Sequence, residues 1–381
     1  MKIVIAPDSF KESLDAMSVA DAIQRGFCQE LPNAEYVKVP LADGGEGTVE
    51  ALLQALTGNK QYSKATDALG NEVTVMWAIL KDKMGKTALI EVAAASGIDI
   101  IAPEKRNIRD ASTYGTGIVI KEALDQGVDK IILGLGGSAT NDGGAGILQA
   151  LGGRLLDDSG NDLPVGGIAL KDLKAIDLFN LHHRCSEVEL ILACDVDNPL
   201  CGKNGASYIF GPQKGANKDD LQALDLALKQ FAKCGESVNG INALTVSGFG
   251  AAGGTPMGLS LAFDIQIKAG IEMVLDTLDF DLILDNADLV ITGEGQMDDQ
   301  TLQGKAPYGV AKRAQDKGIP VIGIAGSLGK DVKALYSSID CVFGTVRSPQ
   351  PLPQVLEEAE LNLVRTARNI AATLKLGKQV L

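Results

Sequence analysis

Both ends of the chain alternate short apolar runs with amphipathic stretches. Near the start, the apolar run 2–6 predicts a strand, and apolar positions at helical spacing after Ser18 predict a helix. Ser18 has Asp21 three residues on, which is the spacing of a capping box. A second strand at 36–39 and a helix ending at Leu56 follow. This order predicts an open α/β sheet with ligands at the carboxyl ends of its strands.

The last third of the chain returns to this pattern, whereas the middle differs from it. The final segments comprise predicted strands at 288–292, 320–325 and 341–345, a helix at 308–317 and a long helix from about Gln354. In the middle, 72–80 and 86–92 are β-rich with no helical pattern between them, which indicates antiparallel or mixed strands. Trp77 fits a core position there. The sequence therefore predicts an α/β protein.

A glycine-rich loop follows the apolar run 131–133 and precedes a helical stretch at 145–151. A loop of this kind leaves backbone N–H groups free to point at one spot, and a helix dipole favours an anion there. The alternative is a tight turn that only packs strand against helix. The polar side chains in the loop favour phosphate binding, and its candidate residues are Gly136, Gly137, Ser138, Thr140 and Asn141.

Acidic and basic side chains also follow other predicted strands. Lys11 and Asp43 follow the first two, and Asp195 and Asp197 follow a buried strand at 188–194. The loop after the strand at 288–292 adds a further set, which consists of Glu294, Asp298, Gln300 and Lys305. Carboxylates at such positions are suitable ligands for Mg²⁺, which takes one or two of them and completes its shell with phosphate and water. Ordinary surface turns and helix caps are the alternative.

Composition and charge exclude several classes of protein. A length of 381 residues allows two domains, and the net charge of −14 argues against a nucleic-acid-binding surface. The six cysteines form no CxxC pair, so we expect reduced thiols rather than a zinc site or a disulfide framework. Lys2 leads directly into a strand and no apolar run reaches 18 residues, so we expect a cytoplasmic protein without a membrane partner.

Known nucleotide motifs are weak or missing in the sequence. The segment Gly248–Gly253 formally matches GxGxxG, but Pro256 follows closely and no acidic residue has the expected spacing. Neither a Walker A motif nor a protein-kinase glycine loop with its HRD partner occurs. An NAD(P)-dependent oxidoreductase and a non-catalytic metabolite-binding protein remain as alternatives to a phosphate-transferring enzyme.

The whole chain resembles the type-1 glycerate kinases, which make 2-phosphoglycerate. The segments that carry this resemblance are PDSFKESL at 7–14, LADGGEGT at 41–48, YGTG at 114–117, LGLGGSATNDGGAG at 133–146, ACDVDNPL at 193–200, FGPQKGA at 210–216, GFGAAGG at 248–254 and the stretch from ITGEG to GKAP at 291–307. The resemblance implies ATP, Mg²⁺ and D-glycerate. Separately, we expect a monomer or a homodimer. Gln296 departs from the family pattern, which has Arg there, so no guanidinium role is carried over.

The resemblance also implies the domain organisation. It predicts a flavodoxin-like parallel-sheet domain from both chain ends, residues 1–58 plus 276–381, and an inserted α/β domain with a mixed sheet, residues 59–275. The active site is expected in the cleft between them.

We expect the triphosphate to bind at 136–141, as phosphoryl transfer mainly needs positioning and charge neutralisation. Asp195 is the first candidate for the Mg²⁺ ligand, followed by Asp197 or Glu294. Lys11, or alternatively Lys305, would neutralise phosphate or the glycerate carboxylate. Since His182 and His183 lie in an apparent surface segment, the general base is expected to be a carboxylate, and the two candidates for it are Asp43 and Asp298.

Overall fold

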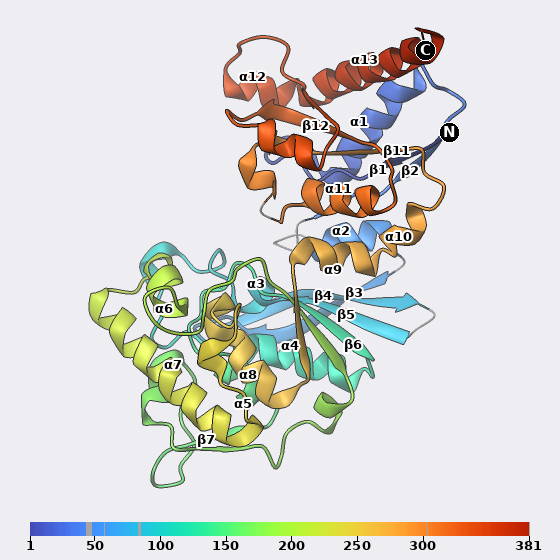
Figure 1. Ribbon diagram of the computed structural model, residues 1–381. Coiled ribbons are helices and arrows are strands. Elements are labelled where there is room, and N and C mark those ends of the chain that lie inside the picture. Colours follow the sequence, from blue (N-terminus) through green and yellow to red (C-terminus); the bar gives the residue numbers. More distant parts are fainter. Residues whose placement is uncertain (43–47, 57, 83–84, 303, 381) are drawn as a thin grey trace. The chain divides into compact units, whose positions relative to one another are not determined.

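The computed structural model describes residues 1–42, 48–56, 58–82, 85–302 and 304–380 and divides into two compact units. Unit 1 consists of Met1–Asp43, Glu50–Leu56 and Gly270–Leu381, and unit 2 of Gly44–Val49 and Thr57–Ala269. Figure 1 shows the blue and red ends of the chain together in unit 1. The chain passes between the units at 43/44, 49/50, 56/57 and 269/270. The sequence predicted two boundaries, at 58/59 and 275/276.

Unit 1 contains a five-stranded sheet in which every pairing is parallel. Its strands are β1 (Lys2–Ile5), β2 (Glu35–Lys38), β11 (Leu289–Met297), β12 (Val321–Leu328) and β13 (Cys341–Gly344). The spatial order is β13-β12-β11-β1-β2, which is 2-1-3-4-5 when the strands are counted along unit 1. This is the flavodoxin-like order, so the prediction for this unit is confirmed. Its topological switch point lies between β1 and β11.

Helices α1 and α13 pack on one face of this sheet. The helices placed wholly or largely in unit 1 are α1 (Ala16–Cys28), α2 (Thr48–Ala55), α9 (Gly270–Thr277), α10 (Phe280–Ile283), α11 (Ala306–Asp316), α12 (Leu352–Glu357) and α13 (Ala359–Val380). Ile3 and Ile5 share a buried cluster with residues of α1 and α13. Gly26 allows the close approach of these two helices, because a Cβ atom there would lie 2.5 Å from the carbonyl oxygen of Val364.

The start of α1 differs from the sequence prediction. The helix begins at Ala16, and Asp15 is its N-cap, because the Asp15 side chain accepts a hydrogen bond from the N–H of Ser18 at 2.7 Å. Ser18 therefore lies inside the first turn, and its spacing to Asp21 does not form a capping box. Either Asp15 or Ser18 can cap a helix, and the apolar positions alone do not choose between them.

Unit 2 is built on a six-stranded mixed sheet in the order β10-β9-β6-β5-β4-β3. The strands are β3 (Gly58–Thr66), β4 (Glu72–Asp82), β5 (Gly85–Glu91), β6 (Lys130–Gly134), β9 (Glu189–Ala193) and β10 (Ile265–Lys268). The first four in this order pair in parallel, whereas β4 and β3 are antiparallel, which confirms the mixed sheet. A separate hairpin pairs β7 (Arg154–Leu156) with β8 (Ala175–Asp177). Sequence analysis did not anticipate β3, a mostly polar edge strand, or the four-residue β10.

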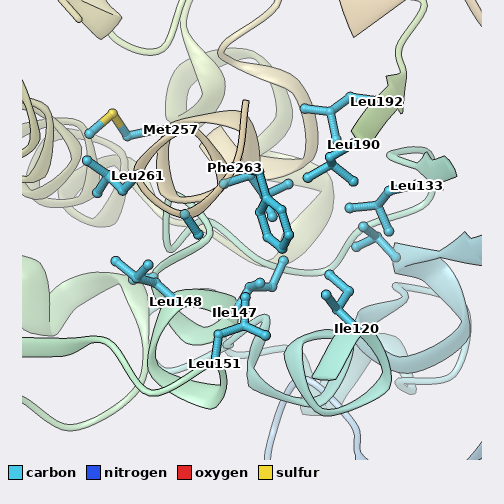
Figure 2. Packing of buried hydrophobic residues seen from close by; sticks show 14 of the residues in the cluster. Ile120, Leu133, Ile147, Leu148, Leu151, Leu190, Leu192, Met257, Leu261 and Phe263 are labelled. Atoms are coloured by element: carbon cyan, nitrogen blue, oxygen red, sulfur yellow. The ribbon is translucent and has the colours of Figure 1, made fainter. Parts of the chain in front are cut away.

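The helices of unit 2 surround a large apolar core. They are α3 (Val92–Ser96), α4 (Tyr114–Asp125), α5 (Ala145–Ala150), α6 (Ala206–Phe210), α7 (Lys218–Asn239) and α8 (Thr255–Ala262). Figure 2 shows Phe263 between Leu190 and Ile147. The residue after α8 therefore packs between strand β9 and helix α5. Trp77 is fully buried, as expected, and its indole Nε1 donates to Ser63 Oγ at 2.7 Å. Among the described residues, no helix combines the length and the apolarity that a membrane span requires.

Candidate active site

Glu294 lies inside a strand rather than in the loop after it. Strand β11 continues to Met297, because β12 runs alongside it and pairs Glu294 with Ala325 and Met297 with Leu328. The sequence predicted that this strand ends at residue 292, since the glycines that follow indicate a turn. The neighbouring strand overrides that signal. Glu294 is therefore held by a sheet at the switch point of unit 1.

A hydrogen-bonded group surrounds Glu294. Its carboxylate accepts from Thr301 Oγ1 at 2.7 Å and from Lys305 Nζ at 3.1 Å, and the Glu294 side chain is buried. The Thr301 hydroxyl also accepts from the N–H of Asp298 at 3.1 Å. Thr301 thus connects two predicted site residues. Asp298 itself is half-buried and accepts from the N–H of Gln300 and from Gln296 Nε2.

The loop after β1 lies against the same part of β11. The N–H of Asp8 donates to the carbonyl of Gly293 at 2.8 Å. A Cβ atom at Gly295 would lie 3.6 Å from the backbone nitrogen of Lys11, and Lys11 is exposed. The structure of unit 1 therefore brings Lys11, Glu294, Asp298 and Lys305 to the switch point, where flavodoxin-like sheets bind ligands. Asp43 lies outside the described residues.

The glycine-rich loop between β6 and α5 exposes only part of its length. Gly136 and Gly137 are exposed, whereas Ser138, Thr140 and Asn141 are buried. Among the backbone N–H groups of this loop, that of Ala139 donates to the carbonyl of Ser96 at 2.8 Å. The surface that the loop offers to a ligand is therefore the Gly136–Gly137 turn.

The Asp142 carboxylate accepts hydrogen bonds from the backbone N–H groups at the start of α5. Its Oδ1 accepts from the N–H of Gly144 at 3.1 Å, and its Oδ2 accepts from the N–H of Gly146 at 3.1 Å. The N–H of Thr113 donates to the same Oδ2 at 2.8 Å. The sequence argument assigned an anion from solvent to this helix start, but a buried carboxylate of the protein lies there. Helix α5 is also only six residues long, so its dipole contributes little.

Lys214 lies beneath the glycine-rich loop. It ends the 3₁₀ helix η4 (Pro212–Lys214), and its side chain is 3% exposed. Its Nζ donates to Ser138 Oγ at 2.8 Å and to the carbonyl oxygen of Thr140 at 2.7 Å. Burial lowers the pKa of Lys214 to about 7, and the negative charge of Asp142 opposes part of that change.

Three of these residues were not among the predicted site residues. Lys214 and Asp142 stand in conspicuous glycine-rich stretches, FGPQKGA and TNDGG, but polar residues in such stretches are mostly solvated turn residues. Thr301 carries no sequence signal beyond its place among acidic residues. Burial identifies all three, and burial of a polar residue in a loop is a property of the tertiary fold.

The acidic pair after β9 is exposed. Asp195 and Asp197 follow Ala193 with exposed side chains, and the carbonyl of Asp197 accepts from Ser247 Oγ at 3.2 Å. Over the described ranges, no three His, Cys, Asp or Glu side chains are grouped so as to hold a metal ion. Asp195 and Asp197 belong to unit 2 and Glu294 to unit 1, so their joint action on a metal stays a prediction.

The GFGAAGG stretch supports the glycine-rich loop from below. A Cβ atom at Gly253 would lie 2.0 Å from the carbonyl oxygen of Thr140, and the φ angle of Gly253 is +68°. The carbonyl of Gly253 accepts from the N–H of Gly143 at 2.9 Å. This stretch leads through η6 (Ala251–Gly254) into α8. Its glycines permit close packing of backbone on backbone.

A hollow of about 570 Å³ lies elsewhere on unit 1. Ser18, Asp21, Gln24, Arg25, Cys28 and Glu360 line it, on helices α1 and α13. It contains none of the predicted site residues and does not lie at the carboxyl ends of strands, so we assign it no catalytic role.

Comparison with known proteins identifies the family of the chain. The profile of the glycerate kinase family matches residues 3–375. The chain is 50% identical over 379 residues to the glycerate kinase of Bacillus subtilis strain 168, covering 99% of each protein. It is 47% identical over 378 residues to the glycerate 2-kinase of Escherichia coli K12, again covering 99% of each.

A solved structure has the same fold. It is the crystal structure of a candidate glycerate kinase 2 from Salmonella typhimurium LT2, with a TM-score of 0.90 and 48% sequence identity. The match covers 100% of this chain and 99% of that one. The profile, the full-length relatives and the fold agree with the resemblance found in the sequence, and the chain belongs to the glycerate kinase family.

Proposed function

We propose that this protein transfers the γ-phosphoryl group of ATP to D-glycerate, producing 2-phospho-D-glycerate and ADP. Its near full-length identity of 47% to a protein named glycerate 2-kinase carries this proposal. An oxidoreductase role has no such support, because the GFGAAGG stretch packs against another loop of unit 2 through Gly253.

The nucleotide phosphates are proposed to bind at the Gly136–Gly137 turn. This turn is exposed while the rest of its loop is buried, and a turn without Cβ atoms lets phosphate oxygens approach the backbone closely. The turn is held in place from below by Ser138, which accepts a hydrogen bond from Lys214. Rigid support of this kind suits a reaction that depends on positioning.

D-Glycerate is proposed to bind at the switch point of unit 1. Lys11 is exposed there and supplies positive charge for a carboxylate or a phosphate group. Lys305 is the alternative, but its Nζ already contacts Glu294 at 3.1 Å. Asp298 is the general base that the described residues offer, and Asp43 stays the second candidate. That the sites of the two units act on one bound pair of substrates stays a prediction.

Mg²⁺ is proposed as the metal ion, with Asp195 and Asp197 as its protein ligands. Their exposed carboxylates supply the hard oxygen atoms that Mg²⁺ takes together with water and phosphate. Glu294 fits less well, since its carboxylate oxygens already accept from Thr301 and Lys305. When bound with ATP, the ion would neutralise charge on the phosphate oxygens.

Free thiols favour a cytoplasmic location. All six cysteines are free thiols, which is typical of proteins in a reducing compartment. We propose a cytoplasmic enzyme that is a monomer or a homodimer, and light scattering on the purified protein distinguishes the two states.

The reaction is tested by ADP release from MgATP with D-glycerate, with the product identified by ³¹P NMR. We expect turnover to give 2-phosphoglycerate. A 3-phosphoglycerate product would contradict the proposed position of transfer but keep the kinase. A lack of turnover on D-glycerate, in protein that binds ATP, would contradict the proposed substrate.

The general base is tested separately with Asp298→Asn and Asp43→Asn. If the base is one of these carboxylates, one of the two variants should lose a factor on the order of 10² or more in kcat while staying folded. Near-normal kcat in both variants would refute a carboxylate base at these positions.

A further inference from the structure

Lys214 turns its side chain inward from a surface segment. Its neighbours Pro212, Gln213 and Gly215 are exposed, whereas Lys214 itself is buried. Lysine rarely does this, because the ammonium group loses its hydration and the chain could place it in water at little cost. Among the residues that the structure describes, the hydrogen-bond acceptors of Lys214 Nζ are a hydroxyl and a carbonyl oxygen rather than a carboxylate, so its burial needs an explanation in the function or the assembly of the loop it contacts.

The hydrogen bonds of Lys214 hold the glycine-rich loop at two points. Nζ donates to Ser138 Oγ and to the carbonyl oxygen of Thr140, and both acceptors are uncharged. A neutral amine has two N–H groups and an ammonium has three. Both contacts therefore persist when Lys214 loses a proton, and protonation adds a third donor and a positive charge.

The charged groups near Lys214 supply little negative charge to balance its ammonium group. Asp142, in the loop before α5, is the carboxylate whose charge acts on it. That carboxylate is already used by the N–H groups of Gly144 and Gly146. Arg106, from the segment after α3, donates from Nη1 to the carbonyl of Gln213 at 3.0 Å and so adds positive charge beside Lys214.

Two consecutive loop residues have polar atoms without a partner. Thr140 is fully buried and Asn141 is 1% exposed. Within the described parts of the chain, neither Thr140 Oγ1 nor Asn141 Oδ1 has a hydrogen-bond partner. Native proteins leave few such groups unsatisfied, so each calls for an explanation, and contact with a bound polar ligand is one that fits this loop. These atoms belong to the same loop that Lys214 holds, so they are an independent indication that the loop receives a polar ligand.

We propose that Lys214 is a positioning residue of the nucleotide site, which ties Ser138 to Thr140 beneath the Gly136–Gly137 turn and places an ammonium group there when an anion binds. This inference rests on the proposed binding of nucleotide phosphate to that turn. The ligand class is a phosphate anion, because a buried lysine and a glycine turn both favour negative charge.

The proposal predicts a selective effect on nucleotide binding. Lys214→Met removes both hydrogen bonds and the charge, and Lys214→Gln keeps an NH₂ donor but removes the charge. Each variant should raise the KM for ATP and the Kd for ADP by roughly ten- to a hundredfold. The KM for D-glycerate should stay within about twofold. Lys218→Met is the matched control, since Lys218 is exposed four residues further on, and it should change none of these constants.

Proton uptake provides a readout that a merely structural role would not move. ADP binding is measured by calorimetry at pH 8 in buffers of different ionisation enthalpy. The wild-type protein should take up close to one proton more than Lys214→Met does, because the bound anion favours the ammonium form of Lys214. If Lys214→Met does not fold, Lys214→Gln provides the same comparison, because it also lacks the titrating amine and the proton exchange of ADP itself cancels in the difference.

The outcomes separate this inference from the proposed function. If Ser138→Ala and Lys214→Met both kept the wild-type KM for ATP and Kd for ADP, phosphate binding at the loop would be refuted. A raised ATP KM in Ser138→Ala with a wild-type value in Lys214→Met would refute the role of Lys214 alone. If Lys214→Met raised the KM values for ATP and D-glycerate equally and did not change proton uptake, Lys214 would have only a structural role.

Discussion

The buried Lys214 should make the stability of unit 2 depend on pH, and replacing it by Met should remove that dependence. The folded protein binds the Lys214 proton with a pKa of about 7, against 10.5 as the ordinary value of the group. Between these two values the unfolded chain carries a proton at Lys214 that the folded chain has released. Unfolding therefore takes up a proton, and the free energy of unfolding of the wild type rises with pH in this range.

The size of the effect follows from a single proton. The wild-type free energy of unfolding minus that of Lys214→Met should rise by up to about 1.4 kcal/mol per pH unit above pH 7. Below pH 7 both states keep the proton, so the difference is constant there and least favourable to the wild type. The two lost hydrogen bonds add an offset of roughly 1–3 kcal/mol that favours the wild type at every pH, since Ser138 Oγ and the Thr140 carbonyl lose a donor.

Trp77 makes the measurement specific. It is the one tryptophan of the chain and is fully buried in unit 2, the unit that contains Lys214. Urea unfolding followed by its fluorescence at pH 6, 7, 8 and 9 gives the stability of that unit for the wild type and for Lys214→Met. Lys218→Met should follow the wild type at each pH, because Lys218 is exposed and its replacement leaves the hydrogen bonds of Lys214 in place. A wild-type minus Lys214→Met difference that is flat from pH 7 to pH 9 would refute the burial argument.

Three further substitutions test other contacts. Asp142→Asn should lower the free energy of unfolding by about 3 kcal/mol in urea, because its amide NH₂ would face backbone N–H donors. A loss below about 1 kcal/mol would contradict this. Ser63→Ala should cost about 1–3 kcal/mol by leaving Trp77 Nε1 unpaired, and an unchanged transition would show that another acceptor replaces the hydroxyl. Thr301→Val should lower kcat about tenfold in steady-state assays with unchanged circular dichroism, since Glu294 loses a donor; wild-type kcat would exclude a positioning role.

Local patterns predicted the architecture well because each strand carries its own signal. The apolar runs at 2–6 and 131–133 mark β1 and β6. The lack of a helix between β4 and β5 indicated antiparallel or mixed strands, and the two strands pair antiparallel. What the pattern could not give was the length of β11. The backbone of Glu294 continues the strand because β12 lies beside it, and the partner strand is separated from it by helix α11 in the sequence.

The candidate site shows the same division between local and tertiary information. Spacing placed polar residues at the ends of strands, and the parallel sheet of unit 1 brings Lys11 and Asp298 to the switch point as that argument requires. Spacing could not show that Asp142 takes the amide groups at the start of α5, or that Lys214 reaches the loop from a segment more than seventy residues away. Both residues matter because they are buried charges, and a charge is costly in the interior unless the surrounding groups compensate it. The Asp142 carboxylate accepts from several backbone N–H groups of the protein, whereas the proposal assigns to Lys214 a compensating charge that arrives with the bound anion. The pH dependence of the stability difference between the wild type and Lys214→Met therefore measures, without any ligand, the cost of burying the Lys214 ammonium group that a bound phosphate would offset.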